Sequence, residues 1–330
     1  MLRLPSFDVE SPETTDEVLV ALRTPGARLV AGGTDLLPNL KHRLEHPSVL
    51  VSLHRVASLR GVAHDRQAGM LRLGAGVTLA EIAQHADVRA MFPSLAKAAG
   101  LVAGPQIRNS ATLGGNLNLD TRCRYVNQTK FWRSSIGGCL KSAGNVCHVV
   151  PGGRNCVAAM SSDCAPVLIS LDAIVVLLGP GGERQLPLAD YYRSDGTHHT
   201  RREEGELTTA VCIPLATGAR RSEYAKWRPR GSIDFPLVSL ALRFDLEADA
   251  AEAPITRYRV VAGVLGARPR VVTVPGLEGQ GLAGAGVARA ISEAVFGQCK
   301  PLENVPYEAP HRRHLLRMLS RRAVEGLAAP

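Results

Sequence analysis

Apolar residues in the first part of the chain recur at spacings that predict a short helix followed by two buried strands. Residues 12–24 carry apolar side chains at helical intervals, and Ser11 is the expected N-cap. Uninterrupted apolar runs at 28–31 and 49–53 predict two buried strands. Together these elements predict a compact βαβ-like unit over residues 1–55.

The pattern restarts in residues 56–218, where strands and helices are again expected. Alternating apolar positions predict a strand at 71–76, and Thr78 begins a helix that continues to residue 86. A second helix is expected at 95–103, ended by the breakers Gly104-Pro105. The apolar run at 167–178 predicts a helix followed by a strand.

The last third of the chain, residues 219–330, has a different order of elements. Three apolar runs predict the strands of a separate antiparallel sheet, and two amphipathic segments predict helices. This order predicts an α+β protein that ends in a domain of a small sheet with helices. The expected strands are 224–228, 237–244 and 257–265, and the expected helices are 287–296 and 312–326.

Composition predicts a globular cytoplasmic protein. With 330 residues and 45% hydrophobic content, the chain can bury a substantial core. It shows no apolar h-region of a secretory signal and no apolar stretch of about 18 residues. The net charge of +9 does not indicate nucleic-acid binding, because the arginines are scattered among acidic residues. Seven cysteines in a chain of this size indicate reduced thiols rather than a disulfide framework.

Four of the cysteines fall within one polar segment that has no clear periodicity, the pattern of an inserted functional loop. Their spacing, C-x15-C-x7-C-x8-C, is too wide for a zinc ribbon and unlike bacterial ferredoxins, but four thiolates suit one metal centre. The spacing alone leaves zinc and an iron-sulfur cluster equally open, and His148 is expected beside the ligands rather than among them. The candidate ligands are Cys123, Cys139, Cys147 and Cys156.

The segment around these cysteines is basic. Residues 121–160 contain six Lys or Arg residues and no Asp or Glu. Such cations would stabilise an anionic thiolate-ligated cluster and attract an acidic redox partner. The simpler interpretation is a basic surface loop. The six residues are Arg122, Arg124, Lys130, Arg133, Lys141 and Arg154.

Two glycine turns are candidates for holding a dinucleotide. Gly32-Gly33-Thr34-Asp35 follows a predicted strand, and Gly114-Gly115-Asn116 lies two residues after Thr112. Neither has the spacing of a Rossmann fingerprint or a P-loop. Adjacent glycines let backbone N–H groups approach a pyrophosphate, although a glycine pair alone is more commonly only a tight turn.

These turns carry a resemblance to a known family. Segments 31–36 and 107–117 resemble the two FAD loops in the flavoprotein subunits of molybdenum hydroxylases, of the xanthine dehydrogenase and carbon monoxide dehydrogenase type. The resemblance extends to 162–166 and 224–226. Here residues 119–160 follow the GGN turn, and this insertion resembles that of the 4-hydroxybenzoyl-CoA reductase β subunit, which binds a 4Fe-4S cluster.

The resemblance implies a two-subdomain FAD-binding fold, with subdomains at 1–55 and 56–218 and a C-terminal α+β domain. It also implies that the four cysteines bind a 4Fe-4S cluster, since a redox-inert zinc ion beside a flavin has no evident task. Cys164 stands where a small residue is usual. It is expected to be a buried packing thiol, and the alternatives are a fifth cluster ligand or a group that alters access to the flavin. The implied FAD-binding residues are Val30, Ala31, Gly32, Gly33, Thr34, Asp35, Leu36, Val102, Thr112, Gly114, Gly115, Asn116, Asp163 and Lys226.

The function implied is electron transfer without substrate chemistry in this chain, which has no HExxH pair and no Ser-His-Asp order. The expected partners are a molybdopterin subunit and a small subunit with 2Fe-2S clusters, assembled as a dimer of heterotrimers. In the 4-hydroxybenzoyl-CoA reductase type, an acidic ferredoxin supplies electrons through 4Fe-4S and FAD to molybdenum, which yields benzoyl-CoA.

Three alternatives stay open. The first is a conventional molybdenum hydroxylase subunit that passes electrons outward to NAD or another acceptor. The second is a zinc-stabilised structural protein with vestigial flavin loops. The third is a self-sufficient FAD oxidase, which the absence of an obvious substrate domain disfavours. Because the flavin turns lie elsewhere in the chain, replacing Cys139 or Cys147 is expected to remove iron and leave FAD bound.

Overall fold

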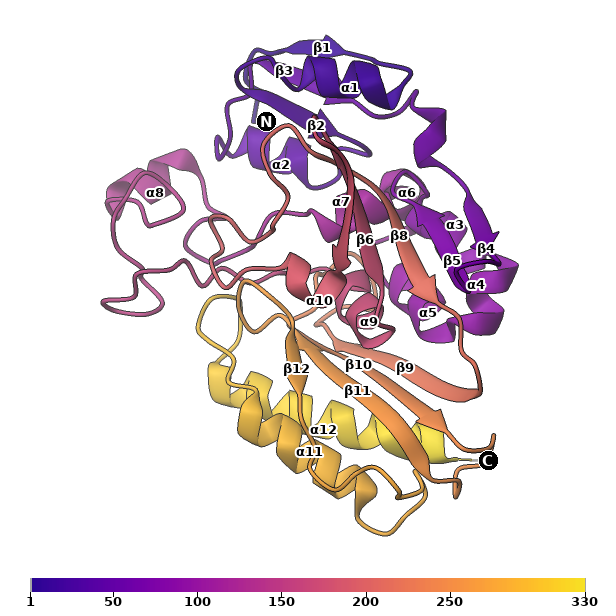
Figure 1. Cartoon of the computed structure of the whole chain (residues 1–330). Coiled ribbons are helices and arrows are strands. Elements are labelled where there is room, and N and C mark those ends of the chain that lie inside the picture. The colour runs from indigo at the N-terminus through magenta and orange to yellow at the C-terminus, as the bar shows by residue number, and fades with distance from the viewer. Residues whose placement is uncertain (1, 330) are drawn as a thin grey trace.

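The computed structural model describes residues 2–329, and its first unit is a small parallel sheet at the N-terminal end (Figure 1). The strand order is β1-β3-β2, and all pairs are parallel. The expected βαβ-like unit is therefore present, with the short strand β1 as an unpredicted addition. Its elements are β1 (Asp8–Glu10), α1 (Thr15–Ala21), β2 (Ala27–Val30), α2 (Leu36–Lys41) and β3 (Val49–Ser52).

Helix α1 begins later than the sequence pattern predicts. Its N-cap is Thr14, whose hydroxyl accepts the N–H of Glu17, and the Glu17 carboxylate accepts the N–H of Thr14 in return. The prediction of Ser11 as the cap was therefore wrong. This reciprocal capping box satisfies two otherwise unpaired N–H groups, which a serine followed by proline at that position does not do.

The central unit is a five-stranded antiparallel sheet of order β4-β5-β8-β6-β7. The strands expected at 71–76 and 174–178 are confirmed, as is the helix capped by Thr78. The strands are β4 (Val62–Asp65), β5 (Met70–Gly74), β6 (Ile174–Gly179), β7 (Gly182–Pro187) and β8 (Leu207–Pro214).

Short helices pack along this sheet (Figure 1). Several of them were not predicted. Helix α6 starts at Pro105, a residue taken as a breaker, because proline fits the first position of a helix. The Gly114-Gly115-Asn116 segment, expected to be only a turn, is part of helix α7, whose N-cap is Thr112. A short 3-10 helix, η1, spans Ala57–Leu59. The α-helices are α3 (Leu79–Gln84), α4 (Ala86–Met91), α5 (Pro93–Gly100), α6 (Pro105–Ser110), α7 (Leu113–Leu117), α9 (Cys164–Ser170) and α10 (Leu188–Tyr191).

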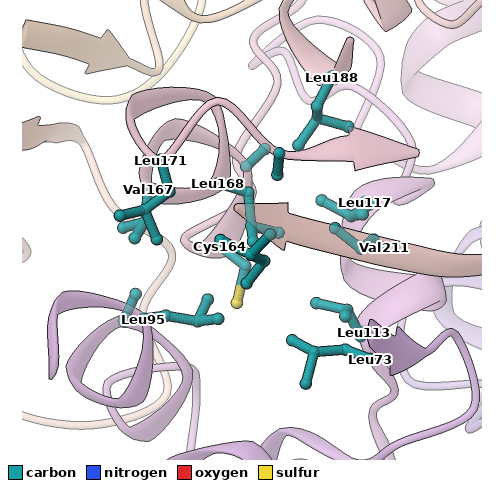
Figure 2. Close-up of a cluster of buried hydrophobic side chains, with 14 of the residues drawn as sticks. Leu73, Leu95, Leu113, Leu117, Cys164, Val167, Leu168, Leu171, Leu188 and Val211 are labelled. Carbon is teal, nitrogen blue, oxygen red and sulfur yellow. The ribbon is translucent and has the colours of Figure 1, made fainter. Parts of the chain in front are cut away.

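The main core lies where α9 meets these helices and the central sheet. Cys164 is fully buried there, and Figure 2 shows it among aliphatic side chains. Burial raises the pKa of this thiol strongly, so it stays protonated and packs as a small apolar group. Its neighbours in the core include Leu73, Leu95, Leu113, Leu117, Val167, Leu168 and Val211.

The C-terminal sheet has the order β12-β11-β10-β9 and is antiparallel, as predicted. Helices α11 (Val287–Gln298) and α12 (Ala309–Ala328) pack against one face, and α9 faces the other (Figure 1). Strand β10 is buried on both faces, which explains its continuous apolar run. The strands are β9 (Ala219–Trp227), β10 (Val238–Leu246), β11 (Ile255–Gly263) and β12 (Arg270–Val272).

The cysteine segment is largely irregular and stands out to one side of the molecule (Figure 1). Its one helix is α8 (Lys130–Ser135). Strands, helices and this insert together give the mixed α and β architecture expected from the sequence. Within residues 2–329, no helix is both long and apolar enough to cross a bilayer.

Candidate functional site

A cavity of about 680 Å³ opens between the N-terminal sheet, the central unit and the segment before β10. Both glycine turns line it. Every residue expected to contact FAD lies on its wall except Lys226, which is buried behind Asp163. Those lining residues are Val30, Ala31, Gly32, Gly33, Thr34, Asp35, Leu36, Val102, Thr112, Gly114, Gly115, Asn116 and Asp163.

The first turn needs both of its glycines. A Cβ on Gly32 would lie 2.0 Å from the backbone oxygen of Ser110, so only glycine lets the first turn approach the segment just before the second. Gly33 has a φ of +67°, the left-handed region that favours glycine. This close contact joins two segments almost 80 residues apart into a single wall of the cavity.

The second turn is fixed by side-chain hydrogen bonds. The Thr112 hydroxyl accepts the N–H of Gly115 at 3.1 Å, and a Cβ on Gly114 would lie 2.9 Å from that of Ala75. Asn116 is buried, and its Oδ1 accepts both the Ser162 hydroxyl at 2.6 Å and the N–H of Cys164 at 3.2 Å. The turn is therefore held rigidly against the start of α9.

Behind the cavity wall lies a buried ion pair. Asp163 accepts a hydrogen bond from the Tyr224 hydroxyl at 2.6 Å, and Lys226 Nζ lies 2.8 Å from the same carboxylate oxygen. Both ionic side chains are less than 5% exposed. The Lys226 ammonium makes no aligned hydrogen bond, and burial lowers its pKa. The ammonium is thus an available donor and positive charge close to the cavity.

The residues around the cavity fit a dinucleotide such as FAD. Its first glycine turn presents backbone N–H groups without side chains, as a pyrophosphate requires. The N–H groups of the second turn, from Leu113 to Asn116, are already hydrogen-bonded within the protein. FAD, when bound, supplies a carrier of one or two electrons. Sequence reasoning missed many polar or aromatic wall residues, which lie outside the two glycine turns and reach the cavity only through the fold. They include Asn118, His199, Arg202, Thr208 and Phe235.

His199 is the most perturbed titratable group on the wall. Its Nε2 is buried and has no hydrogen-bond partner. Burial is the main cause that lowers the pKa of this imidazole to about 4, with Asp120 opposing the shift and Lys141 adding to it. The ring is therefore neutral at pH 7 and leaves one nitrogen free to meet a ligand.

The four cysteines expected to bind a metal centre are brought together in the fold. Cys123, Cys139, Cys147 and Cys156 line one small cavity of about 20 Å³, together with His148. Val150 donates its N–H to the Cys147 sulfur at 3.4 Å. Ala158 donates to the Cys156 sulfur at 3.5 Å.

Burial keeps two of the thiols in this cavity protonated in the absence of a ligand. It raises the pKa of Cys123 to about 11, with the neighbouring Cys156 and Cys139 adding to the shift, and it also raises the pKa of Cys156. Within residues 2–329, no three His, Cys, Asp or Glu side chains are gathered tightly enough to hold one metal ion. His148 Nε2 lies 2.7 Å from the Gly138 oxygen, and its ring stacks on Tyr125. Cys212 and Cys299 lie elsewhere, in β8 and after α11.

Comparisons with known proteins agree with this geometry. Residues 5–216 match the family model described as FAD binding domain in molybdopterin dehydrogenase. The chain is 34% identical over 307 residues to the aldehyde oxidoreductase FAD-binding subunit PaoB of Escherichia coli (strain K12), covering 90% of this chain and 91% of that subunit. It is 25% identical over 317 residues to the xanthine dehydrogenase FAD-binding subunit of Escherichia coli O157:H7, covering 95% and 93%.

A solved structure shows the same fold. A chain of the carbon monoxide dehydrogenase from Hydrogenophaga pseudoflava superposes with a TM-score of 0.78 at 21% identity, covering 98% of both chains. The matched family model includes both glycine turns and the Asp163 segment. The chain therefore belongs to the FAD-binding medium subunits of the molybdenum hydroxylase family and is an oxidoreductase subunit.

Proposed function

We propose that this chain is a FAD and 4Fe-4S electron-transfer subunit of a molybdenum enzyme whose substrate chemistry takes place on a partner subunit. The observation that carries the proposal is the convergence of Cys123, Cys139, Cys147 and Cys156 on one cavity. The fold gathers four thiols from an irregular segment, although hydrophobic packing alone does not require cysteine there.

The nearby FAD cavity favours a cluster over zinc, because a redox-inert ion beside an electron carrier has no evident task. A zinc ion holds its four sulfurs at about 2.3 Å from one point, whereas a 4Fe-4S cluster places one thiolate on each of four irons. Backbone N–H groups directed at Cys147 and Cys156 are typical of sulfur ligands whose negative charge must be stabilised.

The FAD contacts follow from the cavity wall. The first glycine turn would hold the pyrophosphate through backbone N–H groups, and Val102 would pack beside the flavin end. The second turn, which lacks side chains at Gly114 and Gly115, would let the ligand approach the backbone closely. Lys226 would place its charge near the flavin through Asp163. The other expected FAD residues on the cavity wall would also contact the bound FAD.

The partners that we propose are a molybdopterin-binding large subunit and a small 2Fe-2S subunit, assembled as a dimer of heterotrimers. The relative at 25% identity is named a xanthine dehydrogenase subunit, and a dehydrogenase oxidises its substrate, which supports electron flow outward from substrate to an acceptor. Reductive dehydroxylation of the 4-hydroxybenzoyl-CoA type, with a ferredoxin donor and a role in aromatic degradation, is the second candidate. The four-cysteine insert is the observation that favours it.

The decisive test measures cofactors in the purified chain under anaerobic conditions. Iron, acid-labile sulfide, zinc and flavin are quantified, and EPR spectra are recorded after reduction. About four iron, four sulfide and one FAD, with a signal from the reduced cluster, are the expected result. FAD without iron would support only the flavin part of the proposal. Zinc in place of iron would overturn the cluster assignment.

The direction of electron transfer has to be measured on the assembled enzyme. Outward flow predicts reduction of FAD by an aldehyde, and inward flow predicts that a reduced ferredoxin or viologen drives dehydroxylation. If an acidic protein docks on the basic insert, charge reversal at Arg124 and Lys130 slows its reaction and raised salt has the same effect. A rate that neither change alters would argue against that docking site.

A further inference from the structure

Helix α2 lines the FAD cavity and lies next to the cysteine-bearing insert. Asp35, at its N-terminal end, lines the FAD cavity, as do Leu36 and Asn39. Leu44, just beyond its C-terminal end, packs against the cysteine cluster. A helix of six residues is about 9 Å long, so one short rigid element separates the two sites.

The insert contacts α2 at its N-terminal end through Arg122. The guanidinium of Arg122 makes an ion pair with Asp35, and the other carboxylate oxygen of Asp35 accepts the N–H of Asp120 at 2.9 Å. Arg122 also lies 3.9 Å from the centre of the Phe235 ring, which lines the FAD cavity. Arg122 directly precedes the ligand candidate Cys123, so the two sites share a stretch of backbone.

The insert contacts the other end of α2 through Arg133. This side chain is in α8 and is only 4% exposed. Its Nη2 donates to the carbonyl oxygens of His42 at 2.8 Å and Arg43 at 3.1 Å. Its Nη1 donates to the Gln128 oxygen within the insert. A buried guanidinium thus joins the insert to the end of α2.

The positions of these contacts matter because the insert folds around the cysteines. Arg133 Nη1 lies 3.4 Å from the carbonyl oxygen of Val126, which lines the cysteine cavity. A group bound between the cysteines would order the insert, which fixes Arg122 and Arg133 and through them both ends of α2. When one site is occupied, the entropy cost of ordering the insert is already met, so a ligand at the other site binds more tightly. Such coupling is reciprocal.

We propose that α2, held by Arg122 and Arg133, couples the cysteine cavity to the FAD cavity, so that an intact insert strengthens FAD binding. Arg133 is the positioning residue of this coupling, since it reaches no part of the FAD cavity itself. This proposal rests on the proposed function in one respect, the identity of the group that the four cysteines bind. The contacts of Arg133 with α2 do not depend on that group.

The test measures FAD affinity by titration of the flavin-free full chain with FAD, for the wild type and two variants. Arg133→Gln is expected to weaken FAD binding about tenfold, within the usual range of coupling between sites. Arg124→Gln is the matched control, because this insert arginine contacts the Val305 oxygen at 2.9 Å and not α2. Its FAD affinity is expected to equal that of the wild type.

A third variant separates the coupling from the cluster. Cys139→Ser is expected to lose iron and to weaken FAD binding, in contrast to the independence expected from the sequence. If Arg133→Gln binds FAD like the wild type, the coupling is overturned. If the wild type holds no iron but Arg133→Gln still weakens FAD binding, the assignment of a 4Fe-4S cluster is rejected and the coupling through Arg133 is supported. Should Arg133→Gln not fold, Arg122→Gln tests the other contact with the same readout.

Discussion

At the scale of single residues, the close approach of Gly32 to Ser110 predicts that FAD binding depends on a glycine at position 32. Replacing Gly32 with alanine would place a Cβ 2.0 Å from the Ser110 oxygen, too close for any adjustment of a side chain to relieve. We expect Gly32→Ala to separate the turns and to abolish FAD binding, measured as flavin absorbance per chain. Gly181→Ala, at a position with nothing within 4 Å, is expected to retain full flavin.

The low pKa of His199 predicts a pH dependence of stability. Its folded pKa of about 4 lies below the ordinary value of 6.5, so the unfolded chain binds a proton that the folded chain does not. Stability from this residue is complete above pH 6.5 and is lost as the pH falls towards 4. The loss amounts to about 3 kcal/mol at most, at about 1.4 kcal/mol for each pKa unit.

The measurement is urea unfolding of the flavin-free chain between pH 7 and pH 4. His199→Gln, which cannot take up a proton, is expected to lose less free energy of unfolding over this range than the wild type does. Equal losses in the two proteins would show that His199 is already charged in the folded state.

At the scale of elements, local patterns placed most helices and strands correctly. The strands β2, β3, β9, β10 and β11 and the helices α3, α11 and α12 lie where their apolar periodicity predicts. The errors concern short elements whose signals are local and ambiguous, such as the cap of α1 at Thr14 and the start of α6 at Pro105. The reciprocal hydrogen bonds between Thr14 and Glu17 determine where α1 begins, and packing determines that α6 begins at Pro105.

Helix α12 depends on one buried arginine. Arg312 is fully buried and donates to the carbonyl oxygens of Leu237 at 2.9 Å, Leu302 at 2.7 Å and Val264 at 2.5 Å. Burial lowers its pKa to about 10, so it stays charged at neutral pH. Arg312→Met would leave these acceptors unpaired, at a cost of about 3 kcal/mol in the free energy of unfolding.

Chemical denaturation measures this loss. Arg322→Met, on the exposed face of the same helix, is the control and is expected to change stability by less than about 0.5 kcal/mol. If both variants lost equal stability, the three carbonyl contacts would not be what fixes α12 on the sheet.

At the scale of the whole molecule, the FAD cavity draws its walls from segments spread over most of the chain. Residues 28–36, 102–120, 199–208 and 233–235 all contribute. A ligand that binds only the assembled cavity must therefore stabilise the folded chain. We expect FAD at 100 times its dissociation constant to raise the free energy of unfolding by about 2.7 kcal/mol.

Thermal and urea unfolding with and without FAD test this linkage. FMN, which lacks the adenylate half of FAD, is the control ligand and is expected to stabilise the chain less at the same concentration. Equal stabilisation by FMN would show that the adenylate end of FAD makes no contact in the cavity. The proposed division into domains at 1–55, 56–218 and 219–330 stays a prediction, which limited proteolysis of the FAD-bound chain can check.

The sequence by itself determined the secondary structure of the longer elements, the candidate flavin turns and the four candidate cysteine ligands, because periodicity, glycine pairs and cysteine spacing are local signals. Only the tertiary structure decided that Gly32 approaches the segment just before the second turn, that His199 and Phe235 reach the FAD cavity, and that Arg133 joins the insert to α2. Such contacts join segments far apart in the chain. Which residues meet in these contacts depends on how the elements pack, and the local sequence pattern does not specify this packing.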